Sequence, residues 1–200
     1  EEVNQAVEEA VRENLEGAKD DANKAIDEMP HLSEEQKDDA HKAVNDATDV
    51  AGVEQAVADA AAQNLDAAKA EATQAVDDMT YLSDEQKAEA KDAIQAATTV
   101  PGVEQALADV AAQNLDAAKA DATQAVDDMA YLSDEQKAEA KDAIQTATTV
   151  PGVEQAVADA AAQNLDAARA DATQAVDDMR YLSDEQKAEA KDTIQTATTV

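Results

Sequence analysis

Four acidic side chains flank one short loop, and they are the residues best placed to gather a cation. They are Asp77, Asp78, Asp84 and Glu85. Carboxylate oxygens are the ligands that Ca²⁺ prefers, but the alternating acids and the glycine of an EF-hand loop are missing. Lys87 and Lys91 lie close enough in sequence to offset part of the negative charge. The loop is therefore either a solvated acidic surface or a weak cation site, and the residue pattern favours the solvated surface.

Histidine and tyrosine are the other side chains with chemistry to offer. His31 and His41 could ligate a metal or respond to pH, but both occur only in the first fifty residues, and we interpret them as surface residues. Tyr81, Tyr131 and Tyr181 recur at a fixed spacing, each directly before a leucine. Each tyrosine either closes the core at a turn between helices or is an exposed anchor for a partner.

The composition excludes several classes of function. The chain has no cysteine, no glycine-rich phosphate loop and no nucleophile beside a general base, so we predict neither an enzyme nor a cofactor. Its 46 acidic and 15 basic side chains give a net charge of −31. This negative charge repels nucleic acid and anionic membrane surfaces. No apolar run approaches the ~18 residues of a membrane span, so we expect no membrane insertion.

A period of 50 residues organises the whole chain. The segment GVEQAVADAAAQNLDAA, which begins at Gly52, returns almost unchanged at Gly102 and Gly152, so the chain is four copies of one unit. A unit has few large apolar side chains and no Phe or Trp. The apolar surface that such a unit can bury only about balances an ordering entropy of roughly 1.5 kcal/mol per residue. The free energy of folding of a single unit is therefore near zero. We therefore expect neighbouring units to stabilise one another.

The longest predicted element is a helix from Val53 to Met79, a segment without Gly or Pro. Its apolar residues form one stripe when placed at about 100° intervals. They are Val53, Val57, Ala60, Ala61, Leu65, Ala68, Ala72, Val76 and Met79. The alternative is a break at Gln63–Asn64, where Asn64 would cap a new helix. The high helix propensity of alanine favours one continuous helix, roughly 40 Å long.

A shorter helix is predicted from Ser83 to about Thr98. Ser83 and Gln86 have the spacing of a capping box. The expected buried face consists of Ala90, Ala93, Ile94 and Ala97. Thr98 and Thr99 end this helix and can cap the next one, which in the third copy has Pro101 in its first turn. Each period therefore contains one long helix and one short helix.

One ordered set of residues recurs in every unit and carries a family resemblance. The set is an opening Leu-x-x-Ala-Lys, a Leu-Ser pair, an Ile-x-x-Ala and a following Thr-Val-x-x-Val. In the second copy it consists of Leu65, Ala68, Lys69, Leu82, Ser83, Ile94, Ala97, Thr99, Val100 and Val103. This pattern resembles the GA module, the protein G-related albumin-binding module. GA modules are three-helix bundles of Gram-positive surface proteins, and long arrays of similar modules occur in proteins such as the staphylococcal extracellular matrix-binding protein homologue.

The resemblance implies a register for the bundles. Helix one would run from Leu65 to Met79, helix two from Ser83 to Thr98 and helix three from Val100 to Asn114. Helix three of each bundle would then continue into helix one of the next. The fold class implied is an all-α, elongated rod of tandem three-helix bundles. Its parts would be a trailing helix at 1–14, bundles at 15–64, 65–114 and 115–164, and an incomplete bundle at 165–200.

The resemblance also implies where a partner would bind. Albumin-binding modules use helix two and the start of helix three, with an exposed Tyr and Leu among the contacts. Those two positions hold Ala90 and Ala93 here, so the usual apolar anchors are missing. The candidate partner-binding residues are Tyr81, Ala90, Ala93, Thr98, Gly102, Tyr131, Ala140, Ala143, Thr148 and Gly152.

Together these features favour a structural function. We expect a monomeric stalk or spacer in a bacterial cell-surface protein, extracellular and either secreted or attached to the cell wall, that projects an adhesive region. The alternative is an adhesin module that binds host serum albumin or a matrix protein such as fibronectin weakly. Repetition would raise such weak binding through effective concentration.

Overall fold

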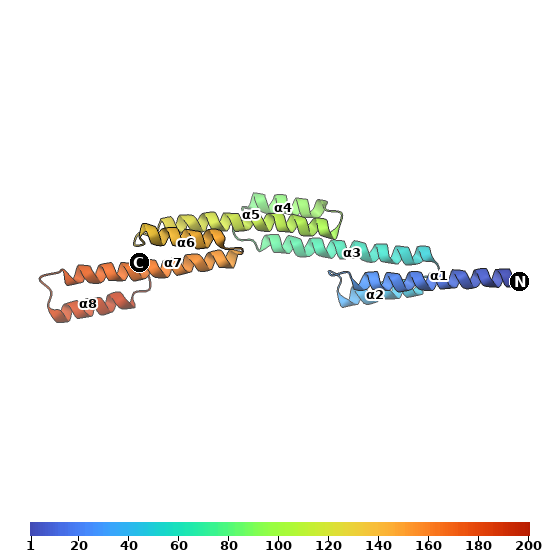
Figure 1. Cartoon of the computed structure of the whole chain (residues 1–200), viewed down its shortest axis with the longest axis horizontal. Coiled ribbons are helices and arrows are strands. Elements are labelled where there is room, and N and C mark those ends of the chain that lie inside the picture. The colour runs from blue at the N-terminus through green and yellow to red at the C-terminus, as the bar shows by residue number, and fades with distance from the viewer. The chain divides into compact units, whose positions relative to one another are not determined.

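The computed structural model describes residues 1–200 and contains eight helices and no strand (Figure 1). Long and short helices alternate along the chain. They are α1 (Glu2–Asp27), α2 (Glu34–Asp46), α3 (Val50–Asp77), α4 (Asp84–Ala96), α5 (Val100–Asp127), α6 (Asp134–Thr146), α7 (Val150–Asp177) and α8 (Asp184–Thr196). The chain divides into two compact units, Glu1–Ala111 and Ala112–Val200, which are described separately.

The helix α3 runs without interruption through Gln63 and Asn64, so the alternative of a break at this point is wrong. Ala-rich sequence on both sides of the pair favours this continuity. The helices α5 and α7 have the same 28-residue length as α3 and begin at equivalent valines. The first half of each long helix is therefore helix three of one bundle. Its second half is helix one of the next bundle.

Side-chain caps fix the helix ends at the loops. Gln86 donates its backbone N–H to Ser83 Oγ at 3.2 Å, and Ser83 donates its own N–H to Gln86 Oε1 at 3.0 Å, which confirms the predicted capping box. Thr99 Oγ1 accepts the N–H of Gly102 at 3.2 Å, so Thr99 caps α5 as expected. The helices α3 and α4 end at Asp77 and Ala96, each two residues earlier than the sequence suggests.

Two apolar cores lie in the first unit. The helices α1 and α2 and the first half of α3 enclose one core, whose fully buried centre includes Ile26 and Val44. The second half of α3, α4 and the beginning of α5 enclose the other, centred on Val76 and Ile94. The two halves of α3 therefore serve different cores.

The buried stripe of α3 departs from the predicted one. Ala61 is exposed, whereas Ala56 and Asn64 are buried. The buried positions follow one another at intervals of three and four residues, the spacing of a single helix face. They are Val53, Ala56, Ala60, Asn64, Ala68, Ala72 and Val76.

The buried face of α4 is narrower than predicted. Ile94 is fully buried, and Ala90 and Ala97 pack against the core at its edge. These residues are spaced i, i+4 and i+7, whereas Ala93 lies about 100° away from Ile94 around the helix axis. Ala93 is consequently exposed, and its expected burial is wrong.

The second unit repeats this packing. The helix α6 packs against α7, and α7 packs against α8. Ile144 is fully buried, as Ile94 is in the first unit. Lys119 Nζ donates to the backbone oxygen of Gln145 at 2.8 Å and joins α5 to α6. In α8 the equivalent Ile194 is only half-buried.

None of the eight helices is both long enough and apolar enough to cross a membrane.

Candidate functional site

The predicted contact residues of helix two form a small and weakly apolar surface. Ala93 and Ala143 are exposed on α4 and α6, whereas Ala90 and Ala140 are half-buried at the core edge. No large apolar side chain accompanies the two exposed alanines. A methyl group offers little surface to bury, so these positions lack the anchors that dominate most interfaces.

The threonine and glycine positions at the start of helix three have different roles. Thr98 and Thr148 are exposed. Gly102 and Gly152 are half-buried and donate their N–H groups to the capping threonines, each at 3.2 Å. A Cβ at Gly102 would lie 3.2 Å from Thr99 Oγ1 and 3.5 Å from the Cβ of Ala97. The glycine therefore allows the end of one helix to lie close to the start of the next.

The tyrosines do not fill the core. Leu82 and Leu132 close the turn between helices one and two, each only 7% exposed. Tyr81 is half-buried at the edge of its bundle, and Tyr131 is 41% exposed. The interpretation of Tyr131 as a core plug is therefore wrong, because the adjacent leucine has that role. An exposed ring at this position remains available to a neighbour.

Buried asparagines hold the loops at the junctions between bundles. Asn64 Oδ1 accepts the backbone N–H of His31 at 2.9 Å. Asn164 Oδ1 accepts the N–H of Tyr131 at the same distance. Both asparagines lie in the middle of a long helix and are nearly inaccessible to solvent. Each one fixes the loop of the preceding bundle to the helix that enters the next bundle.

Sequence reasoning assigned no such role to these asparagines. A signal was present, because an amide recurs every 50 residues within an otherwise apolar stripe. A polar side chain at a buried helical position requires a hydrogen-bond partner. The loop N–H groups are those partners.

A second contact reinforces the first junction. His31 Nδ1 lies 2.8 Å from Glu71 Oε2, so the loop of the first bundle contacts helix one of the second. The His31 side chain is only 20% exposed, and its Nε2 is buried without a hydrogen-bond partner. The interpretation of His31 as a surface residue is therefore wrong.

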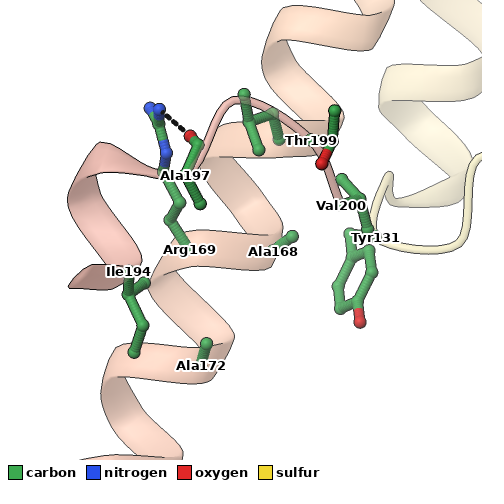
Figure 2. Close-up of a pocket in the computed structure, with 9 residues that line it drawn as sticks. Tyr131, Ala168, Arg169, Ala172, Ile194, Ala197, Thr199 and Val200 are labelled. Carbon is green, nitrogen blue, oxygen red and sulfur yellow. Dashed lines mark hydrogen bonds between the residues drawn. The ribbon is translucent and has the colours of Figure 1, made fainter. Parts of the chain in front are cut away.

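The repeated lysines donate hydrogen bonds to backbone carbonyls at the C-terminal ends of neighbouring helices. From helix one, Lys69 Nζ donates to the backbone oxygen of Gln95 near the end of helix two, at 2.9 Å. From helix two, Lys87 Nζ donates to the backbone oxygen of Asp77 at the end of helix one, at 3.0 Å. Neither helix has a basic residue in its own last turn, so the positive charge that complements each dipole comes from the partner helix. The second contact recurs in all four copies and the first in the first three, whereas in the fourth copy Arg169 donates to the backbone oxygen of Ala197 instead (Figure 2).

The acidic loop is neutralised in part by lysine. Lys91 Nζ forms an ion pair with Asp77 Oδ1, and Lys141 and Lys191 repeat it with the equivalent aspartates. No group of three or more His, Cys, Asp or Glu side chains is arranged to hold a metal ion. The loop is therefore built around lysine contacts.

The first copy replaces one of these lysines with His41. Its Nε2 lies 2.9 Å from Asp27 Oδ1 and its Nδ1 lies 2.7 Å from Asn23 Oδ1. His41 is 26% exposed and thus occupies the place of Lys91 as a bridge between helices. His41 thus has a bridging role that its interpretation as a surface residue did not include.

One exposed ion pair distinguishes the same copy. Hydrogen bonding to Asp46, together with its charge, raises the pKa of Lys42, and the same contact lowers the pKa of the Asp46 carboxyl. Both groups are fully exposed, so solvent screens their attraction. This pair adds little to the stability of the bundle.

Comparison with known proteins gives the family. The family model for the GA module matches residues 12–65, 62–110, 112–164 and 162–200. Among solved structures, the crystal structure of EbhA (756-1003 domain) from Staphylococcus aureus is similar at 21% identity, covering 93% of this chain and 95% of that chain, with a TM-score of 0.29. No curated protein matches the chain significantly. Because the four family matches together span nearly all of the sequence after the first turns of α1, the chain belongs to the GA module family and contains that module in tandem.

Proposed function

We propose that this chain is a stalk or spacer segment of a bacterial surface protein, extracellular and secreted or wall-attached, which holds an adhesive region away from the cell. In this proposal the bundles comprise residues 15–64, 65–114 and 115–164. Residues 1–14 are the trailing helix of another bundle, and residues 165–200 are helices one and two of an incomplete one. The chain acts through stiffness and length, without catalysis or a cofactor.

The observation that carries this proposal is the junction within the first unit. There the helix α3 passes from one core to the next without a linker. Asn64 binds the loop N–H of His31, and the His31 ring contacts Glu71 on the far side of the boundary. Three connections thus oppose bending at one boundary: a helical backbone, a buried hydrogen bond and a side-chain contact.

Charge supports the same function. The net charge of −31 leaves an excess of solvated carboxylates, while the repeated lysines are engaged at helix ends. A surface with this excess repels other copies laterally and remains hydrated. Both effects suit a segment whose task is to separate other parts of a protein.

A second candidate function is weak, multivalent binding of serum albumin or fibronectin. Membership of the GA module family favours it, and the repeated exposed surface around Ala93 and Thr98 is where such binding would occur. The absence of large apolar side chains at Ala90 and Ala93 argues against tight binding by any one copy.

Distances across the junction test the stalk proposal. Because the chain has no cysteine, spin labels can be placed at Asp38→Cys and Asp92→Cys, exposed sites on α2 and α4. We expect a distance distribution as narrow as that of a control pair within the first bundle, Asp20→Cys and Asp38→Cys. Gln63→Pro should broaden the first distribution because proline breaks the helix, whereas Gln63→Ala should not. A broad distribution in the unmodified background would contradict a stiff junction.

Scattering and titration address the remaining points. The radius of gyration of the 200-residue chain should lie well above the ~16–17 Å of a compact protein of that length. Titration with serum albumin and with fibronectin should give no sub-micromolar binding. Sub-micromolar affinity of one repeat for either protein would favour the binding function over the stalk.

A further inference from the structure

Three replacements in the first copy meet at one place between α1 and α2. The first copy has His41, Asn23 and Asn45 where the other copies have lysine, threonine and glutamine. Asn23 Nδ2 donates to Asn45 Oδ1 at 3.4 Å, and Asn23 Oδ1 lies 2.7 Å from His41 Nδ1. The other ring nitrogen of His41, Nε2, lies 2.9 Å from Asp27 Oδ1. The three replaced residues therefore form one connected polar network, which Asp27 completes.

Both ring nitrogens of His41 face oxygen atoms that accept hydrogen bonds. A neutral imidazole carries a proton on one nitrogen only, whereas the charged imidazolium donates from both. The Asn23 amide presents its oxygen to the ring because its nitrogen donates to Asn45. Turning that amide round would break this bond or require Asn45 to turn as well. The charged ring is therefore the form that satisfies every contact of the network.

The other copies hold a permanent positive charge at the place of His41. Lys91 Nζ forms an ion pair with Asp77 Oδ1, and Lys141 and Lys191 form the same pair in their own copies. Lys87, one turn before Lys91, donates to the backbone oxygen of the same aspartate. Two cations thus lie beside one carboxylate. Lysine remains charged up to about pH 10, whereas histidine ordinarily loses its charge between about pH 5 and 8.

The charged groups around His41 come from α1 and α2. Asp27 is the carboxylate on α1. Lys37, one turn before His41 on α2, donates to the backbone oxygen of Asp27 at 2.9 Å. Lys42, the next residue along α2, pairs with Asp46 instead. Apart from the histidine, this arrangement matches the second bundle, so a second cation beside the aspartate is compatible with the fold.

The helix α3 forms no ion pair with His41 and contacts the other histidine instead. Glu71 Oε2 lies 2.8 Å from His31 Nδ1, and His31 Nε2 is buried without a hydrogen-bond partner. One proton, on Nδ1, is enough for the contact with Glu71. A second proton on Nε2 would be a buried donor without an acceptor, which is costly. His31 therefore suits a neutral ring, unlike His41.

From this geometry we propose that His41 makes the first bundle more stable in mild acid, a response that the second bundle, with Lys91, lacks. In mild acid the charged ring bridges α1 and α2 by donating to Asn23 and Asp27. As the pH rises toward about 8, the ring loses one donor and its attraction to the aspartate. The folded bundle holds the charged ring better than the unfolded chain does, so the stability from this bridge is present in acid and lost in alkali. This property does not depend on the proposed stalk function.

Hydrogen exchange of the full 200-residue chain tests the proposal. The amide of Val44 reports on the first core and that of Ile94 on the second, so the ratio of their protection factors removes effects common to both bundles. The background variant is His31→Tyr, which restores the residue of the other copies and leaves His41 as the only histidine. In this background the ratio should be about two- to tenfold higher at about pH 5.5 than at about pH 8.

The matched control replaces His41 with the lysine of the other copies. In His41→Lys the ratio should stay constant over the same pH range, and at about pH 8 it should exceed that of the chain with His41. This variant should fold normally, because the other three copies form the bridge with lysine. A ratio that does not change with pH in the chain with His41 would overturn the proposal. A change of equal size after His41→Lys would also overturn it, because the response would then come from other groups.

Discussion

Asn64, in the middle of a 28-residue helix, accepts a hydrogen bond of 2.9 Å from the backbone N–H of His31, 33 residues earlier in the chain. The amide therefore fixes the loop of one bundle at the point where the helix leaves that bundle. Asn164 and Tyr131 form the same contact in the second unit. The junction contains a specific polar contact in addition to a continuous helix.

Removing this amide should destabilise the junction. Asn64→Ala leaves the part-buried N–H of His31 without an acceptor, at a cost of about 1–3 kcal/mol, while the better helix propensity of alanine returns about 0.5 kcal/mol. Urea unfolding should show a net loss of about 1–2 kcal/mol. The exposed neighbour Gln63→Ala is the control and should not lower stability. Equal effects of the two substitutions would show that the hydrogen bond contributes nothing.

The lysine contacts at helix ends should contribute measurably to stability. Lys69→Met removes the donor to the backbone oxygen of Gln95 and keeps much of the apolar stem, so the loss should be about 0.5–1 kcal/mol. Lys24→Met is a suitable comparison, because Lys24 forms an exposed pair with Asp21 only. Thermal unfolding of both variants should show a lower midpoint for the first. A larger loss for Lys24→Met would contradict the capping role.

Substitutions at two adjacent residues of α4, Ala93 and Ile94, should change the stability by very different amounts. Ile94→Val should cost about 0.5–1.5 kcal/mol and Ile94→Ala about 2–4 kcal/mol, because Ile94 is a fully buried residue in a core with few large side chains. Ala93→Ser, at an exposed site, should change stability by less than about 0.5 kcal/mol. Denaturant unfolding of the three variants gives this comparison directly. A large cost at Ala93 would show that this alanine contacts the core after all.

Divalent cations should not bind the acidic loops specifically. Lys91 already neutralises Asp77, so Ca²⁺ should shift the unfolding midpoint no more than NaCl of equal ionic strength does. Isothermal titration calorimetry should show no saturable heat. The variant Lys91→Ala frees the carboxylate and serves as the sensitised comparison. Saturable binding by the unmodified chain would establish a cation site at the loop.

Much of the fold could be predicted from the sequence because local signals agreed. The Ser83–Gln86 box, the Thr99 cap and the uninterrupted alanine-rich segment each correspond to features of the structure. These features depend on a few neighbouring residues and on helix periodicity. The GA module resemblance added how the helices group into bundles.

The contacts between elements were harder to predict. The roles of Asn64 and His31 depend on a loop 33 residues away, and no local pattern specifies which loop N–H a buried amide will bind. The exposure of Ala93 depends on how α4 is rotated about its axis, and an alanine-rich helix has a weakly defined apolar face. Ile94 is the one large apolar side chain of α4, so the sequence defines the rotation of this helix weakly.

The helix α3 couples the stability of two cores. Its first half closes the core around Val44 and its second half closes the core around Ile94, along one ladder of backbone hydrogen bonds. When one core melts, the nearest turns of the shared helix lose their packing and fray, which loosens the adjoining core. Unfolding of one bundle should therefore destabilise its neighbour, so that adjacent bundles unfold cooperatively. Two joined bundles should also be more stable than the same two bundles produced as separate proteins.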